Sequence, residues 1–348
     1  MTTKKKIRKA DIASLLGEWG QEFTVLVPSR DDGVAKWDKW DGQDTSFLDW
    51  YRNTVVPAKA LFFPPMEEMF RFRKEKGSYQ IEKPDADGPG QLVFGVRPCD
   101  ARALKVLDLT FGDAYEDPYY LARRRKGVLV GLGCTSPCAS CFCTSLDSSP
   151  NDAANVDLML TDIGEAFLAE AITEKGEQLL AKTSLGQAAT KADATKATKA
   201  AEAASAKIVR KVDTKGITER LEANFEDEKF WAGIAAKCVS CGICTFLCPT
   251  CYCFDISDEL VRNLGERFRS WDSCAFPVYT KMPMENPREK KWRRLRQKVC
   301  HKYEFYPMNF DLIACTGCGR CIRLCPVNWD ITETLARVPA AEKVKSEK

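Results

Sequence analysis

Histidine is nearly absent from this sequence, and His301 is the one histidine among 348 residues. Chemistry that depends on a pair of histidines, or on a Ser–His couple, is therefore nearly excluded. Long apolar runs are missing as well, since residues 61–63 and 127–132 are far shorter than the roughly 20 residues of a membrane-spanning helix. No apolar run follows the lysine-rich residues 1–9, as a secretory signal would require. We therefore expect a soluble, cytoplasmic protein with no membrane span.

Motifs for nucleotides and nucleic acids are also missing. No G-x-G-x-x-G opens a helix after a strand and there is no P-loop, so we expect no bound flavin or NAD on this chain. The formal net charge is only +3, and the basic residues 287–302 belong to no nucleic-acid reader motif. We therefore expect no nucleic-acid partner. The basic stretch is interpreted as a cationic helix that favours the reduced state of nearby anionic centres or docks an acidic partner.

Cysteine, in contrast, is abundant, with 17 in the chain. A disulfide framework is the plainest alternative, but reducing compartments disfavour disulfides and the number is odd. Thirteen of the cysteines fall into three tight groups, which is the distribution that metal ligands have. The cysteines are therefore interpreted as ligands.

Two of the groups form an internal repeat, C-x2-C-x2-C-x3-C-P, which begins at Cys238 and again at Cys315. In this arrangement three thiolates of one run bind a [4Fe–4S] cluster, and the fourth cysteine binds the neighbouring cluster. The predicted ligands of the first cluster are Cys238, Cys241, Cys244 and Cys325. The predicted ligands of the second cluster are Cys315, Cys318, Cys321 and Cys248. Structural zinc is the alternative, but zinc sites use separated pairs of cysteines rather than triplets with a distant fourth ligand.

The third group lies in the N-terminal half and has a less standard spacing. One cysteine follows a predicted strand, and a C-x3-C-x2-C-x-C run comes later. We predict a third [4Fe–4S] cluster here, because close thiolates repel each other unless a cation holds them. Its predicted ligands are Cys99, Cys134, Cys141 and Cys143. A set of buried or reactive thiols is the alternative.

Four further cysteines are interpreted as accessory thiols: Cys138, Cys251, Cys253 and Cys274. The last three either belong to another metal or substrate-sulfur site or pack beside a cluster and tune its electrostatics, and the second interpretation is favoured. Cys300 has no evident role. No catalytic residue is predicted.

The order of elements predicts an α+β protein. Residues 1–185 are expected to form a mixed α/β domain, because short apolar strands at 23–27, 91–96, 127–132 and 157–160 alternate with helical patterns at 101–109 and 166–180. Residues 186–212 are rich in Ala, Lys and Thr and are predicted to be a linker or a solvated helix. In residues 213–348, the segments 217–237, 251–309 and 330–338 are expected to be mostly helical. This part resembles the all-helical two-cluster ferredoxin domains of electron-transfer subunits, which implies an all-helical two-[4Fe–4S] domain.

Further blocks of sequence resemble a known family. They lie at residues 62–67, 94–100, 141–143, 248–255, 271–274, 286–288 and 301–302. The family groups the A protein of anaerobic sulfite reductase, the sulfhydrogenase β subunit, and the B subunit of flavin oxidoreductases linked to heterodisulfide reductase. The resemblance implies an electron relay between a terminal reductase or hydrogenase module and a separate flavin-containing, NAD(P)H-oxidising subunit.

The main hypothesis is therefore a non-catalytic electron-transfer subunit of a soluble anaerobic oxidoreductase complex. The first alternative is a catalytic sulfur- or sulfite-reducing subunit with its own cysteine-based site. The second alternative is a structural zinc or nucleic-acid-binding protein.

Overall fold

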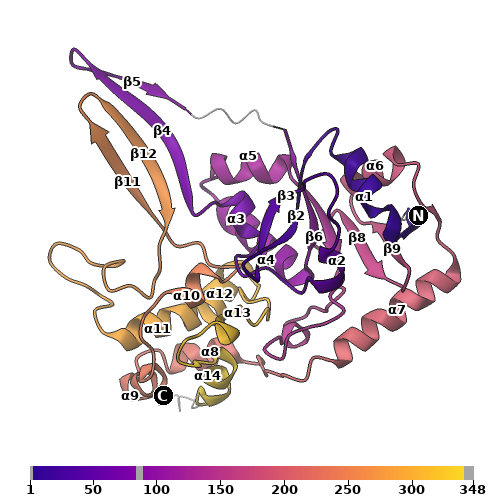
Figure 1. Cartoon of the computed structure of the whole chain (residues 1–348). Helices are drawn as coiled ribbons and strands as arrows, with labels where there is room; N and C mark the ends of the chain where they lie inside the picture. The colour runs from indigo at the N-terminus through magenta and orange to yellow at the C-terminus, as the bar shows by residue number, and fades with distance from the viewer. Residues whose placement is uncertain (1–2, 84–88, 341–348) are drawn as a thin grey trace.

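A mixed eight-stranded sheet organises the N-terminal half of the structure, a computed structural model that describes residues 3–83 and 89–340 (Figure 1). Its strands follow the order β10 (Gln187–Ala188), β1 (Lys4–Arg8), β9 (Ala166–Ala171), β8 (Leu158–Asp162), β7 (Val128–Leu132), β6 (Gln91–Val96), β2 (Thr24–Asp31) and β3 (Val34–Lys39). The central strands β8, β7, β6 and β2 run parallel to one another, and the flanking strands pair antiparallel.

The parallel strands lie where the apolar runs predict them. β6 and β7 are buried along almost their whole length, which explains why both are nearly continuous apolar stretches in the sequence. Pro98 begins α4 (Pro98–Phe111) directly after β6, because the fixed φ of proline suits the first turn of a helix. Cys99 consequently lies at the end of a central strand. The other helices of this half are α1 (Ile12–Trp19), α2 (Phe47–Trp50), α3 (Lys59–Phe62), α5 (Pro118–Lys126) and α6 (Glu174–Lys182).

A long helix, α7 (Lys191–Ala206), leads from the sheet toward the cysteine repeats (Figure 1). It begins with a capping box, in which Thr190 and Asp193 exchange hydrogen bonds. Two of its small side chains, Ala197 and Ala204, are buried. The segment 186–212 thus contains a helix, whereas the division of the chain into separate domains there stays a prediction.

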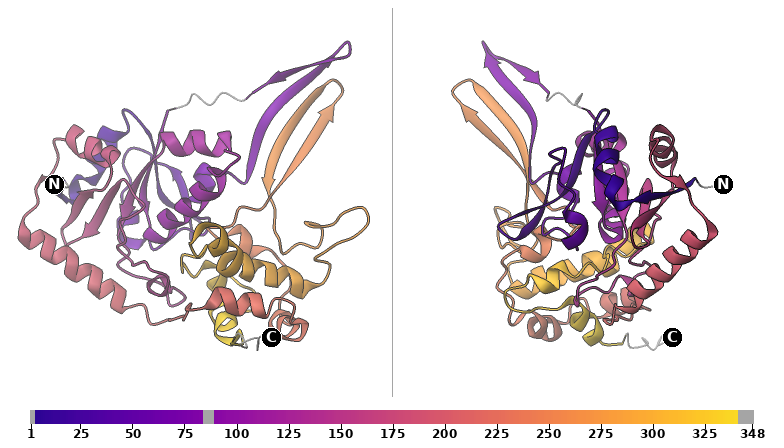
Figure 2. Two further views of the ribbon diagram at one scale, coloured as in Figure 1. Left: turned by 180° about the vertical axis from the view of Figure 1, so that it is seen from behind. Right: turned by 45° about the vertical axis from the view of Figure 1, so that its right-hand side comes forward.

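A second sheet of four antiparallel strands in the described chain projects from the body, as Figures 1 and 2 show. Its order is β11 (Phe254–Val261), β12 (Leu264–Trp271), β4 (Met66–Glu75) and β5 (Ser78–Glu82). One hairpin comes from each half of the chain, and β12 pairs with β4 to join them. Both hairpin turns are tight, with Lys76, Gly77 and Arg262 at positive φ. This sheet is called the arm below.

The prediction of an all-helical C-terminal domain is wrong, because β11 and β12 lie within it. Residues 255–264 contain Glu, Leu and Arg, which favour helices, so local propensity points to the wrong element. The pairing of β12 with β4 overrides that propensity. Because β4 belongs to the N-terminal half, no local pattern near β12 reveals its partner.

Two other helical predictions need correction. Residues 166–180 form β9 and then the start of α6, and Thr173 caps α6 between them. Residues 217–237 contain two helices, α8 (Ile217–Ala223) and α9 (Glu228–Ala235). Asp227 accepts a hydrogen bond from the N–H of Phe230 and so begins the second of them.

The two cysteine runs are repeats in structure as well as in sequence. Each enters a four-residue helix, α10 (Ile243–Phe246) or α13 (Arg320–Arg323). The preceding residues, Gly242 at φ 77° and Gly319 at φ 71°, occupy the left-handed region that glycine tolerates best. Around these loops pack α11 (Lys291–Cys300), a π-helical turn (His301–Phe305), α12 (Tyr306–Phe310) and α14 (Ile331–Arg337). No helix in the described chain is long and apolar enough to span a membrane.

Buried ion pairs fasten the second repeat and the arm to the body. Arg320 of α13 makes two hydrogen bonds to the carboxylate of Asp100 in α4, at 2.5 and 2.8 Å, and both side chains are fully buried. Arg269 of β12 is likewise buried against Glu67 and Asp117. Bidentate arginine–carboxylate pairs are strong and directional, so they fix the orientation of the segments that they join.

Candidate metal centres

The first triplet and the last cysteine of the second repeat line one pocket. Its thiols are those of Cys238, Cys241, Cys244 and Cys325. The N–H of Ser240 points to the sulfur of Cys238 at 3.4 Å, and the N–H of Trp329 points to that of Cys325 at 3.2 Å. The structure therefore brings together the four residues that the repeat predicts as ligands of one cluster. Their role as ligands stays a prediction.

The second predicted set also converges. Burial is the main reason that the pKa of Cys321 lies well above its usual range, and the neighbouring thiols of Cys315, Cys248 and Cys318 raise it further against the opposing charge of Lys298. These four thiols are thus close enough to influence one another. Cys248 comes from the first repeat, as crossed ligation requires.

Unpartnered hydrogen-bond donors lie beside these thiols. Trp329 Nε1, Thr316 Oγ1 and Ser140 Oγ are buried, and none has a hydrogen-bond partner among residues 3–83 and 89–340. Trp329 lines the first pocket, and Thr316 follows Cys315 in the second repeat. Hydrogen bonds to the sulfurs of an iron–sulfur cluster are common and tune its potential. Trp329 and Thr316 therefore suit a cluster at each set.

The thiol sets are not arranged around a single point. In the part of the chain that the structure describes, no three Cys, His, Asp or Glu side chains are grouped so as to hold a single metal ion. The thiolates of a zinc site all lie about 2.3 Å from one ion, whereas those of a cubane surround a core of four irons.

A buried lysine lies between the two sets. Lys298 Nζ donates a hydrogen bond to the carbonyl oxygen of Cys244 at 2.6 Å and pairs with no carboxylate in the described chain. Burial alone lowers the pKa of a lysine, but the surrounding thiols, Cys244 foremost, outweigh burial and hold the pKa of Lys298 well above its usual range. A buried ammonium group needs a counter-charge, and thiolate-ligated clusters are anionic.

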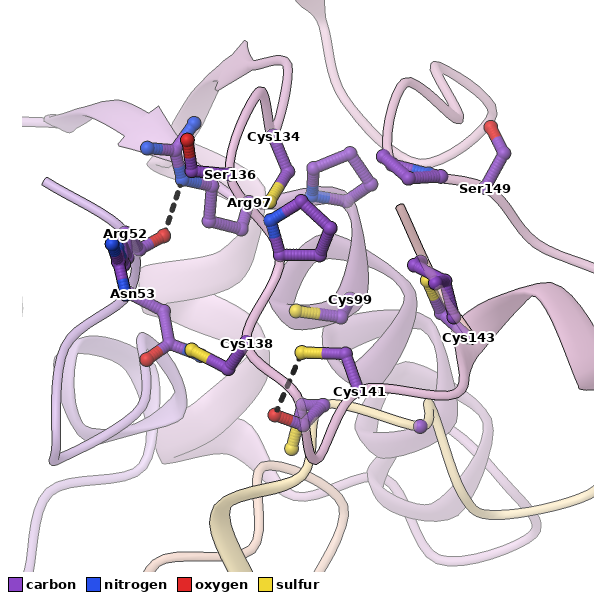
Figure 3. Close-up of a pocket in the computed structure, with 16 residues that line it drawn as sticks. Arg52, Asn53, Arg97, Cys99, Cys134, Ser136, Cys138, Cys141, Cys143 and Ser149 are labelled. Carbon is purple, nitrogen blue, oxygen red and sulfur yellow. Dashed lines mark hydrogen bonds between the residues drawn. The ribbon is translucent and has the colours of Figure 1, made fainter. Parts of the chain in front are cut away.

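The N-terminal cysteines line a third pocket, drawn in Figure 3: Cys99, Cys134, Cys138, Cys141 and Cys143. Figure 3 shows the thiols of Cys99, Cys134 and Cys141 directed into its middle. The predicted third set therefore shares one pocket, and Cys138, interpreted as an accessory thiol, shares it too. The choice of four ligands among the five stays a prediction.

Arg97 holds two walls of this pocket together. Its guanidinium donates to the carbonyl oxygens of Leu132 and Gly133 at 3.0 and 2.6 Å, at the end of β7. It also donates to the carbonyl oxygen of Arg52 at 2.6 Å, which is drawn as a dashed line in Figure 3. Cys99 follows Arg97 closely in the chain and Cys134 follows Gly133, so this contact sets the positions of both thiols.

Cys138 ionises most easily among the thiols of the third pocket whose pKa is shifted. A hydrogen bond donated by Cys141 lowers the pKa of Cys138 to about 6, although burial opposes this. Arg323 donates a further hydrogen bond to its sulfur at 3.3 Å. Burial raises the pKa of Cys134 above its usual value and that of Cys143 to about 11. The spacing in the sequence contains no signal of this difference.

The third pocket adjoins the second thiol set. Cys318 is a member of the second set and also lines the third pocket, and the sulfur of Cys141 lies 3.7 Å from the carbonyl oxygen of Cys318. The N–H of Phe142 donates to the carbonyl oxygen of Gly317 at 2.9 Å. A side chain at Gly317 would place its Cβ 2.5 Å from the backbone nitrogen of Cys143, so glycine is needed for this close approach.

Comparison with known proteins agrees with this geometry. The family described as "4Fe-4S dicluster domain" matches residues 237–329, which hold both cysteine repeats. Sulfhydrogenase 2 subunit beta of Pyrococcus furiosus is 30% identical over 321 residues, which cover 90% of this chain and 92% of that protein. The chain belongs to the sulfhydrogenase β family. No solved structure matches it.

Membership of the sulfhydrogenase β family confirms the resemblance drawn from the sequence blocks. With the dicluster domain, it makes the chain an iron–sulfur, electron-transfer subunit of an oxidoreductase that uses [4Fe–4S] clusters. We propose below how many clusters the chain holds beyond the two of the dicluster domain, and which subunits it joins.

The remaining accessory thiols lie at the base of the arm. Cys251 donates a hydrogen bond to Cys248, and Cys274 donates one to Cys253. Cys300, in contrast, is buried beside Glu304. Its pKa is raised mainly by burial, and none of the causes of that shift is another cysteine.

The basic stretch at residues 287–302, interpreted as a cationic helix beside anionic centres or as a docking surface, is partly buried. It forms α11, in which Arg294, Arg296 and Lys298 are buried. Arg294 donates to the carbonyl oxygen of Ala275 at 2.9 Å, and Arg296 stacks on the ring of Phe225. The charges of this helix therefore face the first cysteine loop and the core as well as solvent.

Sequence reasoning missed the buried cations that organise these sites. Lys59 and Arg320 lie in segments whose local pattern marks neither as buried. Both are buried because segments distant in the chain pack over them, and such packing leaves no periodic signal. The position of Arg320 inside the second repeat is the one available hint.

Proposed function

We propose that this chain is an electron relay between a hydrogenase or reductase module and a flavin-containing, NAD(P)H-oxidising subunit. The observation that carries the proposal is the continuity of its three thiol sets. Lys298 lies between the first and second sets, and Cys318 borders both the second and the third. Electron transfer needs centres that are close neighbours, and a row of this kind leads from the dicluster loops into the N-terminal sheet.

Each part of the row has a defined task. The predicted ligands are the eight cysteines of the two repeats with crossed pairing, and Cys99, Cys134, Cys141 and Cys143 for the third cluster. [4Fe–4S] clusters accept and donate electrons at potentials that the surrounding hydrogen bonds and charges set. Lys298 and the buried N–H and O–H donors supply those charges and hydrogen bonds. The Arg320–Asp100 pair holds the second and third sets in a fixed relation.

Metal analysis of the anaerobically purified chain tests the number of centres. About eight irons per chain correspond to two cubanes and about twelve to the three of this proposal. Cys134→Ser is expected to remove about four irons, whereas Cys300→Ser, a change at a buried cysteine outside the sets, is expected to remove none. A colourless protein that holds zinc and no iron would contradict the proposal.

The relay itself is tested by reduction kinetics. NADH or NADPH is expected to bleach the brown absorbance of the chain when the flavin-containing protein of its complex is present, and to leave it unchanged when that protein is missing. The same reduction is expected to slow in Cys321→Ser, which interrupts the middle of the row. Turnover of sulfite or polysulfide by the isolated chain, with an artificial reductant, would favour the catalytic alternative instead.

A further inference from the structure

Three cysteines outside the predicted cluster sets meet where the arm joins the body. Cys251 and Cys253 precede β11, and Cys274 follows β12, so the pairing of these strands brings them together. The N–H of Asp272 donates to the carbonyl oxygen of Cys253 at 3.0 Å and fixes this junction. Cys251 and Cys274 are buried, and Cys253 is half-buried.

The thiols of Cys253 and Cys274 are direct neighbours. Cys274 donates a hydrogen bond to Cys253, and the same bond, together with burial and the charges of Cys253 and Cys251, raises the pKa of Cys274. Cys251 is therefore close enough to Cys274 to act on it. Thiols gathered in this way repel each other once ionised, unless a metal holds them.

A buried cation without a counter-charge lies against the same group. Lys59 of α3 is buried, and its Nζ donates to the carbonyl oxygen of Cys251 at 2.7 Å. The ammonium also lies 4.1 Å from the centre of the Trp271 ring, and no carboxylate of the described chain pairs with it. Burial lowers the pKa of Lys59 to about 8, and the thiols of Cys251, Cys248 and Cys253 oppose that shift, so an anionic group held by these cysteines favours the charged form of the lysine.

One side of the group opens to a pocket. Cys253 and Cys274 line it together with Tyr279, Arg288 and His301. The imidazole of His301 is held by a hydrogen bond of 2.7 Å between its Nε2 and the hydroxyl of Tyr252. The thiols thus lie between a buried cation on one side and an accessible space on the other.

We propose that Cys251, Cys253 and Cys274 hold a further [4Fe–4S] cluster, separate from the three of the relay, with its fourth iron facing this pocket. Three thiolates give such a core a net negative charge, which offsets that of Lys59. Binding releases one proton from each thiol and requires no change of oxidation state. The fourth iron has no cysteine ligand here, so the pocket admits a small anionic ligand beside Arg288.

Iron content tests this site without reference to the relay. With this cluster the wild-type chain is expected to contain about sixteen irons, and the double variant Cys253→Ser, Cys274→Ser about twelve, the content of the three relay clusters alone, both purified without oxygen. The matched control Cys300→Ser is expected to keep the full content. In Cys134→Ser the cluster held by Cys251, Cys253 and Cys274 is expected to persist. Loss of that cluster and loss of the third relay cluster can therefore be told apart.

Differential alkylation gives a second measurement that needs no variant. In the native holoprotein, Cys251, Cys253 and Cys274 are expected to resist iodoacetamide and to react after the iron is chelated. Peptide mass spectrometry reads each cysteine separately. Equal iron in the double variant and the wild type, alkylation of Cys253 in the holoprotein, or zinc in place of iron would each overturn the proposal.

Discussion

Lys298 and Lys59 are the buried side chains that we propose adjust the neighbouring electron-transfer centres. Neither pairs with a carboxylate in the part of the chain that the structure describes, and both donate to the backbone of a cysteine. An ammonium group stabilises the more negative, reduced form of a neighbouring cluster. Its charge therefore raises the reduction potential.

Replacing Lys298 with Met should lower the potential of at least one cluster of the dicluster domain. A loss of about 1.4 kcal/mol of attraction corresponds to about 59 mV for one electron. Redox titration followed by EPR measures the shift. The control is Lys291→Met, since Lys291 lines the same pocket but donates at the surface to the carbonyl oxygen of Ala236. Equal potentials in the Lys298 variant and the wild type would contradict the assigned role.

Arg320 is the residue whose loss should weaken the fold most. Arg320→Met leaves the carboxylate of Asp100 buried without its partner, which typically lowers the free energy of unfolding by about 3–5 kcal/mol. Anaerobic thermal unfolding followed by circular dichroism measures the change. Glu228→Gln, which removes a solvent-exposed ion pair with Lys290, should leave that free energy nearly unchanged. Comparable shifts in the two variants would show that the buried pair contributes little.

At the scale of elements, one contact joins the second repeat to the third pocket. The loop of the second repeat packs there against the loop at residues 138–143. Gly317→Ala should lower both iron content and stability, because φ is +64° there and the added Cβ meets the backbone of Cys143 at 2.5 Å. Left-handed backbone alone costs a non-glycine residue about 1–3 kcal/mol.

Gly233→Ala is the matched control for this change. Gly233 lies in α9, nothing lies within 4 Å of an added Cβ, and alanine favours helix by about 0.5–1 kcal/mol. The control should therefore keep its iron and gain slightly in stability. Iron content is measured by colorimetric analysis in both variants. Full iron content in Gly317→Ala would contradict the prediction, because it would mean that the two loops tolerate separation.

The elements that the sequence predicts well are those whose signal is local. β6 and β7 are recognisable as apolar runs, and the repeat at Cys238 and Cys315 predicts which four cysteines line the first pocket because its spacing carries the chemistry. The arm is not recognisable, because β12 is a strand only through its pairing with β4 in the other half of the chain. The same holds for Lys59, which is buried by a segment almost 200 residues away, since its bond to Cys251 spans a separation of 192.

At the scale of the whole molecule, the two halves should respond differently to removal of iron. The eight-stranded sheet has an apolar core of its own, whereas the second core includes Cys238, Cys315, Cys321 and Cys325. α10 and α13 have four residues each, too few for a helix to persist without its surroundings.

Anaerobic chelation of iron should therefore expose residues 237–329 to protease at least several-fold faster, while the sheet stays resistant. Limited proteolysis with mass spectrometry of the fragments locates the cuts. The holoprotein treated with chelator buffer already saturated with iron is the control. First cuts within β6 or β7 would show that the sheet, and not the dicluster region, depends on the metal.

The sharing of thiols between the repeats also governs when the protein can mature in a cell. The first pocket lacks one wall until Cys325 exists, and by then the ribosome has already produced the second strand pair of the arm and α11. Iron delivered to an unfinished chain would meet only a partial site. A transcript cut short before codon 325 should therefore yield a polypeptide that lacks the last ligand of the first centre, although it still carries all four cysteines of the second.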